Sequence, residues 1–381
     1  MIETIFVYSL VFLLMLLLNY VSVYIHDHNK VLCIGDRNNN MPILALLLFS
    51  FIFGIRYNVG IDYLRYLNNY ETIYARRENI EIGFNFITKI FTSLDFHFSF
   101  YFTFLAFLQV FLLFYALRNY YKIHSYLIIA FILSSTFLNF MNGIRQEIAF
   151  CFWVLAITFI VKKKIFPYLI CVLLAVSFHI SAVILLPFFL IYRNRNCYFE
   201  NVKIQLLLLL VSLFIMFYFN PVLQIFENLG KVSSFLGLGY DGYIRMVASG
   251  NLKFLEPSRE RGIGFIVILC INVILICLSP KVKEYFKSPF LFIVYDLYFI
   301  GVLYLYLAAG SIALQRINIY FQNFYFIVGA FTLYYLAKNS SMKNKLIHIS
   351  LLFLFFLVFF AIIIYRGEES GAIYSTFWQN N

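Results

Sequence analysis

An arginine close to a glycine and a carboxylate forms the first group of residues in this chain that could do chemistry. Arg56, Gly60, Asp62 and Tyr63 lie within one short polar stretch after an apolar run. The arginine fork matches phosphate oxygens, the glycine permits a tight turn, and the carboxylate can accept a proton. A solvated loop with aromatic anchors at a membrane interface is the alternative. These residues alone do not decide between the two.

A second arginine lies between two apolar runs that have almost no loop between them. Asn142, Arg145 and Gln146 occupy positions i, i+3 and i+4 of a helix, so they share one face. A cation with two amides at a membrane boundary is costly if it faces only lipid. The pattern predicts a polar binding site. An arginine whose side chain extends to the lipid head groups is the alternative.

Further polar residues mark the ends of other apolar runs. Glu81 begins an amphipathic segment, His179 lies at the turn between two short apolar runs, and Arg316 precedes Tyr320 by about one helical turn. Histidine suits proton transfer near neutral pH, although a lone histidine near an apolar surface is more often structural than catalytic. Asp296, inside an apolar run, requires a partner or a cavity, and the sequence does not identify that partner.

Long apolar runs must position these residues. Of the 381 residues, 63% are hydrophobic and 12% are charged, and a bilayer core of roughly 30 Å needs about 17–25 apolar residues per helix. We therefore predict an all-α, polytopic integral membrane protein with a single membrane domain, residues 1–381, and about 12 transmembrane helices, in the range of roughly 10–13. The predicted spans are 3–25, 42–55, 98–117, 124–141, 146–161, 165–178, 180–192, 203–219, 263–279, 288–310, 318–337 and 346–365.

The predicted connections divide into short lysine-rich loops and two larger loops, residues 56–97 and 220–262. The positive-inside rule assigns the lysine-rich loops to the cytoplasm and both termini to the outside. Residues 82–97 are amphipathic and suit an interfacial or re-entrant segment. With this topology the arginine groups and His179 share the outer face.

Composition also excludes several classes of function. The net charge is +11, but no basic tail or basic-aromatic segment indicates nucleic-acid binding. The six cysteines fall in predicted spans and cytoplasmic loops, without the spacing of a disulfide framework or a metal site. No Walker sequence is present, so ATP is not the energy source.

The residues on the outer face suit one kind of ligand. Arginine forks bind phosphate oxygens in a bidentate manner, tyrosines stack on sugar faces and bond their hydroxyls, and the apolar helices leave room for a lipid tail. The sequence thus predicts an amphiphile with a long lipid, a phosphate or pyrophosphate, and a glycan.

The order and spacing of these groups resemble the EpsG-like branch of bacterial polysaccharide polymerases, which includes the Wzy-type O-antigen polymerases. The resemblance is clearest from about Phe53 to Tyr192, and beyond that range it rests on hydropathy and Arg316. The motifs that carry it are Arg56-x3-Gly60-x-Asp62-Tyr63-x2-Tyr66, Glu81-x-Gly83-Phe84, Asn142-x2-Arg145-Gln146-x2-Ala149 and Phe178-His179.

This resemblance implies a membrane-embedded glycosyltransferase with a glycosyltransferase-C-like fold, in the bacterial inner membrane, with its site facing the periplasm. Its donor would be a glycan on undecaprenyl pyrophosphate and its acceptor a single lipid-linked repeat unit. Implied partners are membrane lipids, a flippase, a chain-length regulator and a ligase. An O-antigen ligase and a lipid-linked oligosaccharide flippase or transporter are the alternatives, and the lack of an internal repeat weakens the second of these.

Roles for the site residues follow from the same chemistry. We expect arginines to stabilise the charge on the leaving pyrophosphate, without a metal or other cofactor. The candidates for the general base are Asp62, Glu81 and His179, which are ranked equally. The expected binding residues are Arg56, Tyr63, Asn142, Arg145, Gln146, Arg316 and Tyr320.

Overall fold

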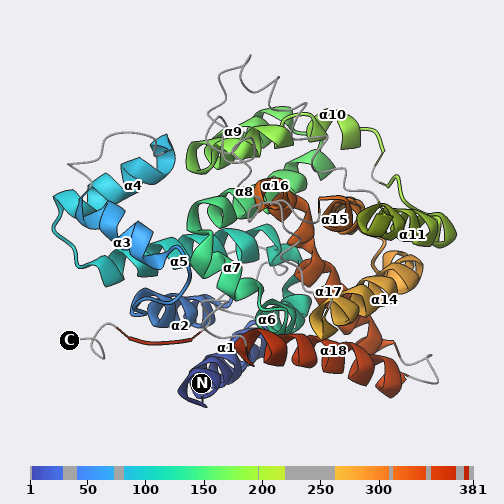
Figure 1. Cartoon of the computed structure of the whole chain (residues 1–381), viewed down its shortest axis with the longest axis horizontal. Coiled ribbons are helices and arrows are strands. Elements are labelled where there is room, and N and C mark those ends of the chain that lie inside the picture. Colours follow the sequence, from blue (N-terminus) through green and yellow to red (C-terminus); the bar gives the residue numbers. More distant parts are fainter. Residues whose placement is uncertain are drawn as a thin grey trace. The chain divides into compact units, whose positions relative to one another are not determined.

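The regular secondary structure of the described residues is helical (Figure 1), and one isolated antiparallel bridge joins Arg56 to Thr376. The structure is a computed structural model. It describes residues 2–28, 41–72, 81–195, 197–218, 262–308, 312–339, 345–365 and 373–376. The chain divides into two compact units. The first comprises Met1–Asn196 and Gly329–Asn381, and the second comprises Cys197–Val328. We describe each unit separately.

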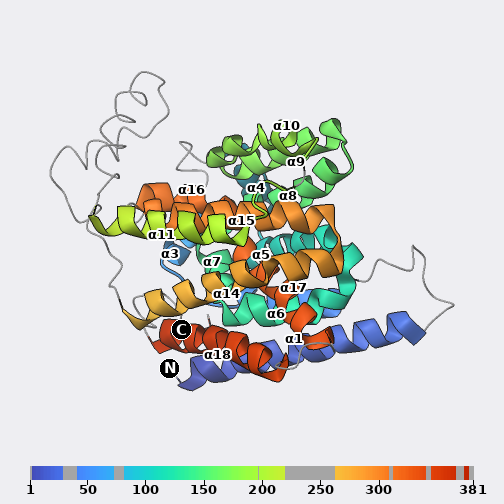
Figure 2. The ribbon, with the colours of Figure 1, turned by 90° about the vertical axis from the view of Figure 1, so that its right-hand side faces the viewer.

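The first unit is built around α8, which is buried along most of its length and packs against α5 and α9. Helix α2 packs on α5, and α6 contacts both α1 and α18 (Figure 2). The helices of this unit are α1 (Ile2–His28), α2 (Ile43–Gly54), α3 (Tyr63–Glu71), α4 (Ile82–Ser93), α5 (Phe98–Ala116), η1 (Arg118–Ile123), α6 (His124–Leu133), α7 (Thr136–Asn142), α8 (Ile144–Val161), α9 (Ile165–Phe178), η2 (Ile180–Leu185), α10 (Phe188–Tyr192) and α18 (Lys345–Tyr365).

The second unit is centred on α15, which contacts α11, α14 and α16. Gly301 allows the close approach of α16, because an added Cβ would lie 2.6 Å from the backbone nitrogen of Gln322. The helices are α11 (Val202–Tyr218), α14 (Ile263–Phe286), α15 (Pro289–Leu307) and α16 (Ile312–Gln322), and α17 (Phe324–Lys338) continues into the first unit.

Every predicted span contains helix, but the predicted count of twelve spans is not confirmed. Within the described ranges, five helices are long and apolar enough to cross a membrane, or six if one bent pair is a single span. Several other predicted spans are helices of only 10–17 residues. The predicted amphipathic segment does form a helix, α4, from Ile82 to Ser93. Apart from Gly262, the predicted loop 220–262 lies outside the described residues.

The predicted span 124–141 is interrupted near its middle. The helix pair that contains it is bent by 70° where α6 meets α7. Ser135 there has a positive φ of 58°, and the Ser134 hydroxyl is 2.7 Å from that of Thr136. Such local hydroxyl contacts compete with helix formation. A hydropathy pattern does not register this break, because the flanking residues remain apolar.

Candidate functional site

The structure places Arg56 in the interior of the first unit, with 2% of the residue exposed. Its guanidinium donates to the carbonyl oxygens of Phe53 at 2.5 Å, Met141 at 3.1 Å and Val59 at 3.4 Å. It also lies 5.5 Å from the Tyr63 ring centroid. Burial lowers the pKa of Arg56 to about 10, so the side chain remains cationic at neutral pH. Arg56 thus joins the loop after α2 to the end of α7.

This geometry predicts that Arg56→Met lowers stability first and activity only as a consequence. Each buried carbonyl that loses its donor costs about 1–3 kcal/mol, so we expect a loss of about 3 kcal/mol or more. Thermal unfolding of the purified protein in detergent would measure it, with Arg65→Met as the control, because Arg65 is exposed on α3. Unchanged stability together with lost activity would instead support the predicted contact between Arg56 and substrate.

A segment near the end of the chain, residues 373–376, covers the same loop. The Tyr57 amide donates to the Ser375 carbonyl at 2.9 Å, and the Tyr374 hydroxyl donates to the Ile52 carbonyl at 2.7 Å. The Tyr374 amide bonds the Thr4 hydroxyl at 3.1 Å. Sequence reasoning missed this contact, because no local pattern links positions more than 300 residues apart in the chain.

The first and second polar groups of the sequence meet at Asn142. Its side-chain oxygen accepts from the Asp62 amide at 2.8 Å, at the start of α3. Gly60 has a positive φ of 100° and lies against the Asn142 side chain, since an added Cβ would be 3.4 Å from the Asn142 side-chain oxygen. Only glycine adopts this backbone conformation without strain. Asn142, predicted to bind substrate, therefore fixes the loop that carries Asp62.

Arg145 and Glu81 form an ion pair that joins the second group to the amphipathic helix. Glu81 is the N-cap residue of α4, and Arg145 lies in the first turn of α8. Both side chains are partly exposed, at 21% for Arg145 and 17% for Glu81. The Tyr66 hydroxyl is a further hydrogen-bond partner of Arg145, and burial raises the pKa of Tyr66. The arginine Nε is buried and has no partner within the described structure.

His179 lies at the end of α9, two residues from the contact between α9 and α4. An added Cβ on Gly83 would lie 2.9 Å from the Ser177 carbonyl oxygen, so the two helices touch there. The His179 ring has its Nδ1 2.6 Å from the Ser181 hydroxyl. The contact at Gly83 thus brings His179 and Glu81 to neighbouring helix ends.

The close contact at Gly83 predicts that Gly83→Val separates α4 from α9. Forcing extra carbon atoms into a packed contact costs about 1–3 kcal/mol, and a shift of α4 would move Glu81 relative to Arg145. We expect reduced function at normal membrane levels, scored by immunoblot beside the activity assay. Ile82→Val is the matched control, because Ile82 is 84% exposed. Full function in the valine variant would contradict a requirement for this packing.

Two predicted binding residues, Arg316 and Tyr320, belong to the second unit. Arg316 is exposed and Tyr320 is buried on α16. Gln315 holds this helix by donating to the Leu305 carbonyl at 3.1 Å. Gln146, in the first unit, is 5% exposed on α8. A shared site for Arg316 and Arg145 stays a prediction.

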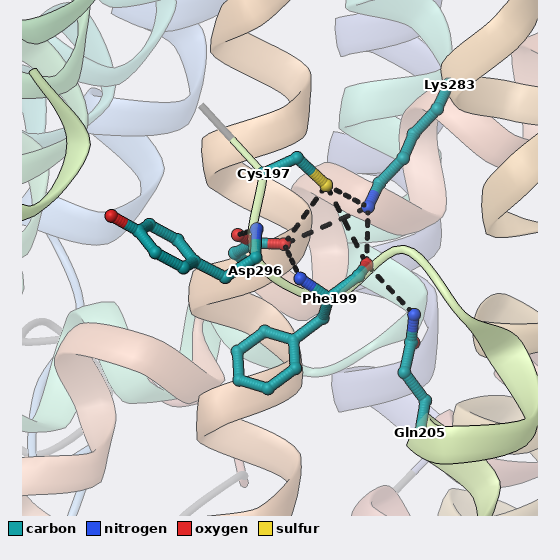
Figure 3. A network of polar contacts seen from close by, with 6 residues as sticks. Cys197, Phe199, Gln205, Lys283 and Asp296 are labelled. Carbon is teal, nitrogen blue, oxygen red and sulfur yellow. Dashed lines mark hydrogen bonds and ion pairs between the residues drawn. The ribbon is translucent and has the colours of Figure 1, made fainter. Parts of the chain in front are cut away.

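The structure identifies the partners of Asp296 that the sequence left open (Figure 3). The carboxylate is fully buried in the second unit, accepts from the amides of Tyr198 and Phe199, and lies 3.9 Å from the Lys283 ammonium. Lys283 also donates to the Phe199 carbonyl at 3.1 Å, and its Nζ is 3.2 Å from the Cys197 sulfur. These contacts make Asp296 a structural anchor for the segment before α11.

Long apolar helices and a polar site at the start of α8 together define the class: a polytopic helical protein that fits a membrane. The chain belongs to the EpsG family, whose family model matches residues 39–377. The match includes the C-terminal half, where the sequence motifs were few. No curated protein and no solved structure matches the chain. Membership of this family suggests a role like that of a polysaccharide polymerase.

Proposed function

We propose that this protein polymerises undecaprenyl-pyrophosphate-linked repeat units into O-antigen or a related surface polysaccharide. The observation that carries the proposal is the partly exposed pair of Arg145 and Glu81 at the start of α8. The pair places a phosphate-binding cation in contact with a carboxylate that can act as a base. The pyrophosphate of the donor would thus meet the arginine, and the acceptor hydroxyl would meet the carboxylate, at one place.

The position of Arg145 supports a role with an anion. The N-terminus of a helix carries partial positive charge, so a cation in the first turn is unfavourable without a counter-charge. Glu81 pairs with Arg145 in the present structure, and Glu147 is a second acidic residue in the first turn of α8. A pyrophosphate would interact favourably with both the arginine and the helix terminus. Charge that develops on the leaving pyrophosphate would be stabilised at the same place.

A buried polar atom also supports a ligand at this site. The Nε of Arg145 has no hydrogen-bond partner within the described structure. Buried polar atoms without partners are rare in native proteins and call for an explanation such as a ligand or an ordered water. An oxygen of a phosphate or a sugar would accept the hydrogen bond that this Nε can donate.

The reaction we propose is a direct displacement at the anomeric carbon of the donor sugar. A hydroxyl of the acceptor sugar forms the new glycosidic bond, the bond to the pyrophosphate oxygen breaks, and a base takes the hydroxyl proton. Glu81 is best placed for this proton, because a pyrophosphate that binds Arg145 would release its carboxylate. Asp62 and His179 remain alternative bases. Asn142 and Gln146, which lie close to Arg145 in the chain and in the same unit, would contact the glycan or the pyrophosphate.

The proposed setting is the inner membrane, with the site open to the periplasm. Lipid-linked glycans would be delivered by a flippase, and a chain-length regulator and a ligase would act with and after the polymerase. An O-antigen ligase uses the same donor but transfers it to a different acceptor. A flippase would move the glycan without releasing undecaprenyl pyrophosphate.

Complementation of a strain that lacks the gene tests this proposal. Surface glycan would be compared for the wild type, His179→Ala, Asp62→Asn and Glu81→Gln, with membrane levels measured in parallel. We expect the wild type to restore a ladder of chain lengths and Glu81→Gln to leave single repeat units. Loss of all glycan in the deletion strain, single units included, would contradict a polymerase and favour a ligase or a flippase.

A further inference from the structure

The backbone breaks between α7 and α8, one residue before the helix that carries Arg145. Helix α7 ends at Asn142, Gly143 lies between the helices with ψ of 45°, and α8 begins at Ile144. The Gly143 amide bonds the Asn139 carbonyl at 2.7 Å, and the Glu147 amide bonds the Gly143 carbonyl at 2.9 Å. The direction of α8, and with it the position of Arg145, depends on how this break is held.

A continuous helix would pair the carbonyls of Phe140 and Met141 with amides four residues later. At the break these carbonyls accept from side chains instead. The Gln109 amide nitrogen donates to the Phe140 carbonyl at 3.0 Å and to the Ile144 carbonyl at 3.2 Å. Arg56 donates to the Met141 carbonyl at 3.1 Å. One Gln109 side chain therefore spans the break, because it bonds a carbonyl on each side of it.

Gln109 is an unusual residue for its place in the chain. It is 2% exposed and lies within α5, an apolar helix long enough to cross a membrane. A buried amide in apolar surroundings is costly unless its hydrogen bonds are made. Non-helical backbone at membrane depth is tolerated where the protein satisfies its polar groups. The two hydrogen bonds of Gln109, to the carbonyls of Phe140 and Ile144, satisfy both its own buried amide and the irregular backbone.

We propose that Gln109 is a positioning residue for Arg145. It sets the angle of α8 across the break, so that the arginine reaches Glu81 and the ligand. Gln109 acts through the Ile144 carbonyl, in the peptide group that precedes Arg145, and not through the Arg145 side chain. The catalytic consequence rests on the proposed function, whereas the structural consequence, the formation of the pair between Arg145 and Glu81, does not.

A stability cycle tests the structural part without any substrate. Glu81→Gln would be measured in the wild type and in Gln109→Met, a variant of similar size without the donor. We expect Glu81→Gln to lower the unfolding temperature in the wild type and to have no further effect in Gln109→Met. Distant sites without shared partners normally add, so this loss of effect reports a coupling between residues that do not touch.

Asn272→Leu is the matched control for the cycle. Asn272 is a buried amide on α14 in the second unit, bonded to the hydroxyls of Tyr298 and Tyr306. Its replacement is expected to lower stability while the effect of Glu81→Gln stays as in the wild type. Additive effects in the Gln109→Met background, as in this control, would overturn the proposal.

A kinetic assay tests the catalytic part. Lipid-linked single units extracted from the deletion strain would serve as the substrate for the purified protein. A small misplacement of a catalytic group can reduce the rate by about 100-fold, so we expect Gln109→Met to lower kcat by about this factor with a smaller change in KM. Gln109→Glu replaces the hydrogen-bond donor by an acceptor, so its kcat should fall by the same factor. A folded Gln109→Met variant with the kcat of the wild type would also overturn the proposal.

The two experiments separate the positioning role from the proposed function. If Arg145→Ala polymerises these units normally, the proposed function of Arg145 fails, yet the stability cycle still shows whether Gln109 positions it. If the cycle is additive while Arg145→Ala is inactive, the proposed function stands and the positioning role is lost.

Discussion

Arg145→Ala is expected to give a surface glycan only one repeat unit long, with no ladder of longer chains, although the protein reaches the membrane at normal levels. Removal of one group that stabilises developing charge reduces an enzymatic rate by about 100- to 1,000-fold. The substitution also leaves the Glu81 carboxylate without its ion-pair partner. Chain length in the complemented deletion strain and turnover of extracted lipid-linked units would both measure this loss.

Two arginine controls make the expected loss specific. Arg145→Lys retains the charge but not the planar fork, so it should recover only part of the activity. Arg65→Ala removes an exposed arginine from α3 and should leave the ladder unchanged. A wild-type ladder in Arg145→Ala would remove this residue from the site. Equal losses in both alanine variants would point to a general effect of surface charge.

The sequence predicted the helical class, and it singled out the polar groups beside the apolar runs for a physical reason. Polar residues at the ends of apolar helices are costly to keep, so the positions of Arg145 and Glu81 were visible in the hydropathy pattern. Their ion pair and the contact of α4 with α9 at Gly83 then bring separate motifs together. Composition alone could not show which residue touches which.

Residues whose partners are backbone groups were harder to interpret. Arg56 has the type and spacing of a phosphate ligand, yet its guanidinium binds three carbonyls in the interior. Gln109 was not singled out, because one amide in an apolar run carries no signal of the helix break that it satisfies. Hydrogen bonds to irregular backbone depend on tertiary structure, so the predicted break between the runs 124–141 and 146–161 did not identify the side chain that bonds across it.

The predicted span count is not confirmed, for a related reason. A run of apolar residues gives the same signal whether its helix is continuous, bent as between α6 and α7, or divided as at Asn323 between α16 and α17. The local hydroxyl contacts of Ser134 and the close approach at Gly301 decide such details. These contacts act over a few ångströms and leave the average hydropathy unchanged.

Asp296→Ala is expected to destabilise the second unit by about 3–5 kcal/mol, because removal of one partner of a buried ion pair leaves the other charge uncompensated. The Lys283 ammonium would keep the Phe199 carbonyl and the Cys197 sulfur as partners (Figure 3), together with the Tyr295 ring, whose centroid lies 5.3 Å away. The amides of Tyr198 and Phe199 would lose their acceptor as well. Thermal unfolding of the purified protein would measure the change.

A double-variant cycle separates the ion pair from these amide hydrogen bonds. Lys283→Met alone should lower stability less than Asp296→Ala does. The Lys283 side chain is 12% exposed, and without it the Asp296 carboxylate still accepts from two backbone amides. The double variant should be more stable than the sum of the single losses predicts, since no buried charge remains unpaired. It should still fall below the wild type, because the two amides lack an acceptor. Lys281→Met, an exposed lysine on the same helix, should change nothing. Additive losses would show that the 3.9 Å approach of Lys283 to Asp296 contributes little, and that Asp296 acts through the backbone amides and the Cys197 thiol.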